Sequence, residues 1–318
     1  MKLTPTVRLF VCPAILLAAA ASYSATKSPL FRVNVDVVQL SFTATDSSGR
    51  YVKGLRPEDI TVLEDGAPQT VLSLWSTEED AAPGSQGAIW ILMDTSSKMY
   101  RYLPQAQDAI ADFIRGLPPA YAIAVYSFSR NIHRTVPLTA DRDALLRHFR
   151  TPCAGAETSI VDSVLLTLRD AETVRGPRRI VVFTSGPDDS SMLSTQDVAR
   201  AAEETGVAVD IVSPAYLDED WHSALIALTK PPGGRTTVAM DWRLQRSEFA
   251  RIGEQLRNSY VVSYRPQRTD NPGFRSVAIK VNKRPGSGDC TVTAARRGYR
   301  PAANEADAEL SARHVAAP

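Results

Sequence analysis

Polar residues occur in three segments that would follow a strand of a sheet or open a helix. Asp94 closes the apolar run 88–93 and is followed by Ser96 and Lys98. Thr158 stands at the start of a helical segment, and Ser185 follows the apolar run 179–184. Carboxylate and hydroxyl oxygens are the ligands that hard divalent cations prefer. If the three segments meet, they could bind such a cation.

The elements that must position these residues are short apolar strands separated by helices. The expected strands are 88–93, 122–128, 179–184 and 207–212. The expected helices are 104–115, 141–149, 159–170, 195–205, 218–228 and 242–257, and 260–264 is strand-like. Fully apolar strands that alternate with helices indicate a parallel sheet covered on both faces. We therefore predict an α/β domain over 87–265, with a doubly wound, mostly parallel sheet. Right-handed crossovers would place the three polar turns at one edge.

Smaller β segments flank this domain. Residues 31–77 alternate between apolar and polar and contain an Asp65-Gly66 hairpin turn, so they predict a small N-terminal β unit. We expect a C-terminal β extension over 266–300. Residues 301–318 have little apolar bulk, which predicts a disordered tail.

The N-terminus has the pattern of an export signal. Lys2 and Arg8 precede a short apolar run and small residues, so residues 1–25 are expected to be a cleaved signal peptide. An uncleaved membrane anchor is the alternative, and we see no other segment of spanning length. The mature protein would be periplasmic, secreted or associated with the cell surface. There Cys153 and Cys290 could form a disulfide or remain two buried thiols.

The net charge of the chain bears on two classes of partner. The chain has 36 Lys+Arg and 35 Asp+Glu, and residues 1–25 contain two of the bases and none of the acids. The mature chain is therefore close to neutral. This balance gives no electrostatic reason to expect a nucleic acid or an anionic membrane as partner.

The order of the polar motifs resembles the von Willebrand factor A family. The matching segments are Asp94-Thr-Ser96, Thr158-Ser-Ile-Val-Asp162 and Thr184-Ser185-Gly186. Segments 55–66, 256–260 and 296–299 also resemble a group of exported bacterial proteins known mainly from acidobacteria. The resemblance implies a Rossmann-like α/β fold and a metal-ion-dependent adhesion site. That site is written Asp-x-Ser-x-Ser, with a distant Thr and a distant Asp.

The sequence departs from this site at two positions. Asp94, Ser96 and Thr158 match expected metal ligands, whereas Lys98 replaces a serine and Ser185 replaces the distant aspartate. We expect a degenerate site that binds no cofactor, or only weakly binds Mg²⁺ or another divalent cation. Lys98 is expected to pair with Asp94 in place of the metal.

Three further carboxylates lie near these motifs in the sequence. Asp188 and Asp189 could supply a replacement ligand, or they could be turn or N-cap residues. Asp162 is expected to accept hydrogen bonds within the domain.

These observations favour a non-enzymatic, extracytoplasmic protein-binding module of the adhesion type. Its binding residues would be Asp94, Ser96, Lys98, Thr158 and Ser185, and the partner is an unknown protein that could contribute an acidic residue. The alternatives are an intact metal-dependent adhesion domain and an envelope scaffold that binds through residues 31–77. A hydrolase with Ser185 as nucleophile is a third class, but no catalytic motif accompanies that serine.

Overall fold

The computed structural model describes residues 37–78, 87–214, 218–230, 233–267, 273–282, 290–294 and 298–299. The predicted signal peptide (1–25) and the predicted tail (301–318) lie outside these residues, as do residues 31–36 of the predicted β unit. In the part of the chain that is described, no helix is both long and apolar enough to cross a bilayer.

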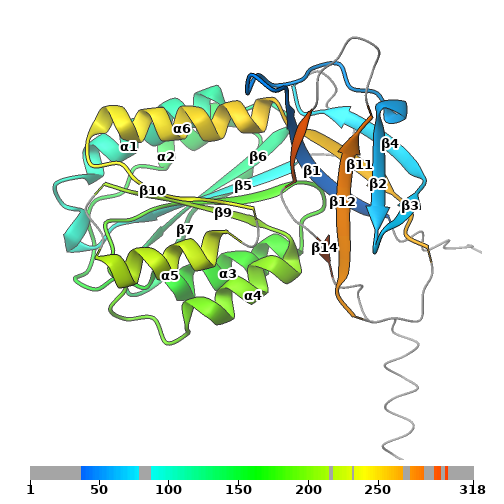
Figure 1. Ribbon diagram of the computed structural model, residues 1–318. Helices are drawn as coiled ribbons and strands as arrows, with labels where there is room; N and C mark the ends of the chain where they lie inside the picture. The colour runs from blue at the N-terminus through cyan, green and yellow to red at the C-terminus, as the bar shows by residue number, and fades with distance from the viewer. Residues whose placement is uncertain are drawn as a thin grey trace, which may run out of the picture. The chain divides into compact units, whose positions relative to one another are not determined.

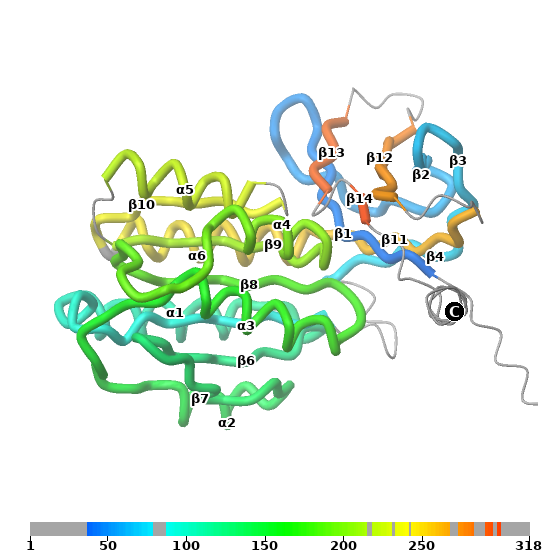
Figure 2. The backbone as a smooth tube through the Cα atoms, turned by 90° about the horizontal axis from the view of Figure 1, so that it is seen from below, coloured from blue at the N-terminus to red at the C-terminus, as the bar shows by residue number. Residues whose placement is uncertain are grey.

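The central sheet has the order β10-β9-β8-β5-β6-β7, which can be followed in Figure 2. Its strands are β5 (Gly87–Asp94), β6 (Tyr121–Phe128), β7 (Ile132–Thr139), β8 (Arg178–Phe183), β9 (Ala208–Ser213) and β10 (Thr236–Val238). All the pairings are parallel except the one between β6 and β7. Every residue of β5 is buried, as expected for a strand in the middle of a sheet covered on both faces.

Helices cover both faces of this sheet (Figure 1). One face carries α1 (Leu103–Gly116), α2 (Arg142–His148) and α6 (Trp242–Arg257), and the other carries α3 (Ile160–Glu172), α4 (Thr195–Thr205) and α5 (Glu219–Thr229). Each helical layer has its own apolar core against the sheet. The predicted doubly wound α/β fold is therefore confirmed. The antiparallel edge strand β7 was not predicted, because its half-exposed sequence lacks the apolar run of its neighbours.

The remaining strands form two antiparallel sheets around a third core. One sheet has the order β13-β1-β11-β4 and the other β14-β12-β2-β3. Their strands are β1 (Val38–Thr45), β2 (Ile60–Glu64), β3 (Ala67–Gln69), β4 (Val71–Ser76), β11 (Tyr260–Tyr264), β12 (Arg275–Val281), β13 (Thr291–Ala294) and β14 (Gly298–Tyr299). We call this part the β-sandwich.

The β-sandwich corrects the predicted domain organisation. N-terminal β1 pairs with β11 and β13, and β2 pairs with β12, so the predicted N-terminal unit and C-terminal extension share one core. The prediction that placed β11 inside the 87–265 domain is wrong, because β11 lies between β1 and β4. All five residues of β11 are buried. A short apolar run of this kind has the same sequence pattern in a parallel and in an antiparallel sheet.

Cys153 and Cys290 form no disulfide with each other.

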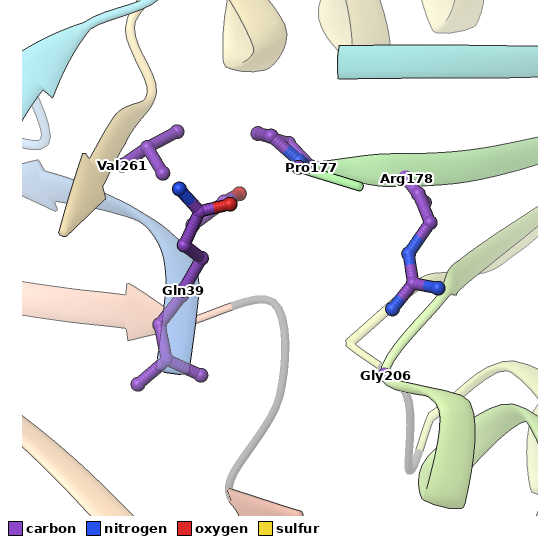
Figure 3. Close-up of a pocket in the computed structure, with 8 residues that line it drawn as sticks. Gln39, Pro177, Arg178, Gly206 and Val261 are labelled. Atoms are coloured by element: carbon purple, nitrogen blue, oxygen red, sulfur yellow. The ribbon is translucent and has the colours of Figure 1, made fainter. Parts of the chain in front are cut away.

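A small pocket is lined by Gln39 and Val261 on one side and by Arg178 on the other (Figure 3). The Arg178 guanidinium donates hydrogen bonds to the carbonyl oxygens of Ala171 and Thr205, near the ends of α3 and α4. Its role in the pocket is therefore structural.

Candidate functional site

Backbone hydrogen bonds bring the three polar loops together at the carboxyl edge of the central sheet. Ser97 N donates to Gly155 O at 2.9 Å, which joins the loop after β5 to the loop before α3. Asp189 N donates to Thr158 O at 3.1 Å, which joins that second loop to the loop after β8. The predicted meeting of the three loops is therefore confirmed. We call this surface, formed by 94–98, 154–158 and 185–189, the carboxyl-edge site.

Asp94 lies at the centre of the carboxyl-edge site and is fully buried. Its carboxylate accepts hydrogen bonds from Ser96 N and from Thr184 Oγ1, both at 2.8 Å. Burial raises the pKa of Asp94 above its ordinary value, and the hydrogen bonds from Ser96 and Thr184 oppose this rise. Thr184 was not among the predicted site residues. Its position directly after the apolar strand β8 is the sequence feature that could have identified it.

Three hydroxyl groups of the site are buried and have no hydrogen-bond partner within the described part of the chain. They belong to Ser96, Thr158 and Ser185. A buried hydroxyl without a partner is costly, so these groups are suited to bind an ion, water or a ligand. Ser185 Oγ has no neighbouring base to which it could donate a hydrogen bond. This arrangement does not favour Ser185 as a nucleophile.

Lys98 pairs with a different carboxylate from the predicted one. Its Nζ lies 2.7 Å from Asp189 Oδ2 and 2.9 Å from Pro187 O. The predicted pairing with Asp94 is wrong, because Ser96 and Thr184 already bind that buried carboxylate, whereas Asp189 is partly exposed. The charge of Lys98 also lowers the pKa of Asp94, but less than the hydrogen bonds from Ser96 and Thr184 do. The lysine thus connects the loop after β5 to the loop after β8.

The other three carboxylates hold the loops in place. Asp189 Oδ1 accepts from Thr158 N at 2.7 Å, and Asp188 Oδ2 accepts from Val161 N at 2.9 Å, so both bind donors at the start of α3. Asp162 accepts from the backbone N–H groups of Met192 and Leu193. The interpretation of Asp162 as an internal acceptor is confirmed. Asp188 thus caps α3 from another loop, and Asp189 binds the backbone just before the helix.

The donor set of the carboxyl-edge site can be compared with the needs of a divalent cation. Three hydroxyl oxygens and the Asp94 carboxylate would leave water molecules to complete the octahedral coordination of Mg²⁺. The charge is less favourable, because Asp188 and Asp189 are engaged elsewhere and Ser185 supplies no charge. No cluster of three or more His, Cys, Asp or Glu suited to a metal occurs among the described residues. These residues therefore do not fit a tightly bound Mg²⁺.

The burial of Asp94 gives a pH-dependent prediction. We expect Asp94→Asn to stabilise the protein at pH 7 in EDTA by about 1 kcal/mol, because it removes a buried charge and keeps a similar shape. The folded-state pKa of Asp94 is raised, so the wild type gains stability as the pH falls, and the advantage of the variant disappears below about pH 4. Urea denaturation from pH 3.5 to 8 measures this difference.

Asp189→Asn is the matched control with the opposite sign. The hydrogen bond from Lys98 lowers the pKa of Asp189, so this substitution should destabilise the protein at pH 7 and have less effect in acid. A loss of stability for Asp94→Asn at pH 7 in EDTA would contradict our description of the Asp94 environment.

The fold and the site define an A-type α/β domain with an Asp-x-Ser turn at the carboxyl edge of its sheet. Residues 89–187 match the sequence profile of the von Willebrand factor type A domain. The chain therefore contains a domain of the von Willebrand factor A family, as its motifs predicted. Domains of this family are generally interaction modules. No curated protein is significantly similar to the chain in sequence.

Several solved structures are similar in fold. The hypothetical protein BatB from Bacteroides thetaiotaomicron is 15% identical, with a TM-score of 0.44, and the match covers 53% of this chain and 98% of BatB. A von Willebrand factor type A protein from Catenulispora acidiphila is 14% identical, with a TM-score of 0.47, over 85% of this chain and 76% of its own. The vWF domain of the type V pili tip protein Mfa5 from Porphyromonas gingivalis is 12% identical, with a TM-score of 0.46. The match covers 60% of this chain and 100% of that domain.

Proposed function

We propose that this chain is an exported protein-interaction module that binds its partner at the carboxyl-edge site without a tightly held metal ion. The observation that supports the proposal best is the position of Lys98. Its ammonium group stands 2.7 Å from Asp189 Oδ2, with 28% of the Lys98 side chain exposed. A cation in this position can be reached by an acidic residue of a partner.

The metal-ion-dependent adhesion site is, in this proposal, degenerate. Among Asp94, Ser96, Thr158 and Ser185 only Asp94 carries a negative charge, and the aspartate expected at the position of Ser185 is absent. A divalent ion bound by Asp94, Ser96, Thr158 and Ser185 would supply a positive charge for a partner carboxylate. In this chain Lys98 supplies that charge.

Binding requires only a small rearrangement of the Lys98–Asp189 pair. Asp189 is 41% exposed at its side chain and also accepts from Thr158 N, so it keeps a hydrogen-bond donor when Lys98 turns towards a partner. An exposed ion pair contributes about 1 kcal/mol or less, so a partner carboxylate can compete for the ammonium group. The same exposure predicts that binding weakens as salt increases.

The test is selection of displayed random peptides on the purified protein, followed by affinity measurement with one selected peptide. We expect selected peptides to contain Asp or Glu. Lys98→Ala should weaken their binding about tenfold or more, since it removes the charge that the carboxylate contacts. Fluorescence polarisation of a labelled peptide measures this change.

Lys53→Ala is the matched control, because Lys53 is also an exposed lysine paired with a carboxylate, Glu78, at 3.1 Å. It should leave peptide affinity unchanged. Selected peptides without acidic residues, or equal binding by wild type and Lys98→Ala, would contradict the proposal. Loss of binding on Lys53→Ala alone would favour the scaffold that binds through its β-sandwich.

A further inference from the structure

Three exposed apolar side chains stand at or just before the first turns of α1 and α6, two helices that begin at the carboxyl edge of the central sheet (Figure 1). Tyr100 is 76% exposed, Met240 is 62% exposed and Leu244 is 50% exposed. Tyr100 precedes α1, Met240 precedes α6 and Leu244 lies in the first turn of α6. Large apolar side chains of this exposure are normal singly, but a group of them indicates an interaction surface.

The packing of α1 against α6 places the three side chains at the same end of the helix pair. The two helices lie side by side on one face of the sheet (Figure 1), and both follow parallel strands, so they run in the same direction. Asp112 of α1 pairs with Arg246 of α6 at 2.9 Å, and the rings of Phe113 and Phe249 lie 5.4 Å apart. The two helices therefore begin at the same edge of the sheet, the carboxyl edge.

Positive charge borders this group of apolar side chains. Lys98 lies two residues before Tyr100, and Arg101 directly follows it, with its side chain exposed. Arg101 forms no ion pair with any acid in the described part of the chain. The nearest acid in the sequence of α6 is Asp241, whose carboxylate caps the helix by accepting from Arg243 N and Leu244 N. Lys98 is balanced by Asp189, so Arg101 carries the positive charge with which an acidic partner could pair.

We propose that Tyr100, Arg101, Met240 and Leu244 form the second half of the binding surface and accept an apolar side chain next to the partner's acidic residue. This inference rests on the proposed function, because it assumes that the partner carboxylate is held at Lys98 or Arg101. It adds that the partner is an acidic segment with a large apolar residue beside the acid. Burial of one such side chain on the patch raises affinity about tenfold over that of the carboxylate alone.

The methionines allow a direct test. Of the five methionines in the chain, Met93 and Met99 are buried in the core, whereas Met192 and Met240 are exposed at the carboxyl edge. The protein is labelled with ¹³C at the methionine methyl groups and titrated with 3-phenylpropanoate, acetate and 3-phenylpropanol. We expect 3-phenylpropanoate to shift the Met240 methyl signal with about tenfold higher affinity than either of the other two probes. The signals of Met93 and Met99 report whether each variant is folded.

Variants separate this inference from the proposed function. Tyr100→Ser should reduce the affinity for 3-phenylpropanoate to that for acetate, whereas Leu166→Ser, at an exposed leucine of α3, should not change it. If Lys98→Ala abolishes probe binding but Tyr100→Ser does not, the apolar patch is overturned and the proposed function stands. If Tyr100→Ser abolishes binding but Lys98→Ala does not, the patch stands and the role of Lys98 is wrong. An unchanged Met240 signal, or equal affinity for all three probes, would overturn the inference.

Discussion

The double substitution Lys98→Ser with Ser185→Asp is expected to create a Mg²⁺ site with about a hundredfold higher affinity than the wild type. It removes a positive charge beside the site and adds a carboxylate to the loop after β8. That carboxylate would join Asp94 and the hydroxyl groups of Ser96 and Thr158, and these two hydroxyl groups have no hydrogen-bond partner among the described residues. Calorimetric titration with MgCl₂ measures the affinities, and each single substitution should give an intermediate value.

The control for net charge is Lys98→Ser with Ser97→Asp. Ser97 is exposed, and its new carboxylate would have the same charge but would not complete the ligand set. This variant should bind Mg²⁺ no better than Lys98→Ser alone. Tight binding by the wild type would show that its site is not degenerate. No gain in the double variant would show that the three loops do not converge on one point.

Glu64→Ala is expected to have the largest effect on stability, a loss of about 3–5 kcal/mol. Glu64 Oε1 pairs with Arg275 at 2.9 Å, and Oε2 accepts from the hydroxyl groups of Tyr264 at 2.6 Å and Tyr299 at 3.0 Å. These residues come from both sheets of the β-sandwich, and the side chains of Glu64 and Arg275 are only 4% and 7% exposed. Alanine would leave the guanidinium without its carboxylate and two buried hydroxyl groups without their acceptor.

Burial and the hydrogen bond to Glu64 also raise the pKa of Tyr299 to about 12. Urea denaturation followed by circular dichroism measures the loss of stability. Glu58→Ala is the matched control, because Glu58 is 68% exposed and lies 3.9 Å from Arg56. Its effect should stay within about 0.5 kcal/mol. Equal losses for the two variants would contradict the buried network.

The sequence predicted β5, β6, β8 and β9 of the central sheet well because these strands are continuous apolar runs. The predicted helices 195–205 and 242–257 agree with the bounds of α4 and α6. The β-sandwich was harder to predict, because β1 pairs with β11 and β13, more than 200 residues further along the chain. Short β segments carry no signal for such distant partners, so two units were predicted where one core exists.

The candidate site could be predicted in its loops but not in its contacts. The positions of Asp94, Thr158 and Ser185 after strands or before a helix indicated one edge of the sheet. The partner of Lys98 could not be predicted, since a lysine side chain can reach either loop, and the hydrogen bonds to Asp94 decide the outcome. The apolar patch was missed because Tyr100 and Met240 are 140 residues apart, and only the packing of α1 on α6 brings their ends together.

Dependence of partner binding on a divalent ion tests the central claim most directly. The affinity of one selected acidic peptide is measured by calorimetry in EDTA and again in 5 mM MgCl₂. If Lys98 provides the positive charge, the two affinities should agree within a factor of about two. Binding that appears only with Mg²⁺ would contradict the claim and would show that Asp94, Ser96 and Thr158 hold a functional metal ion.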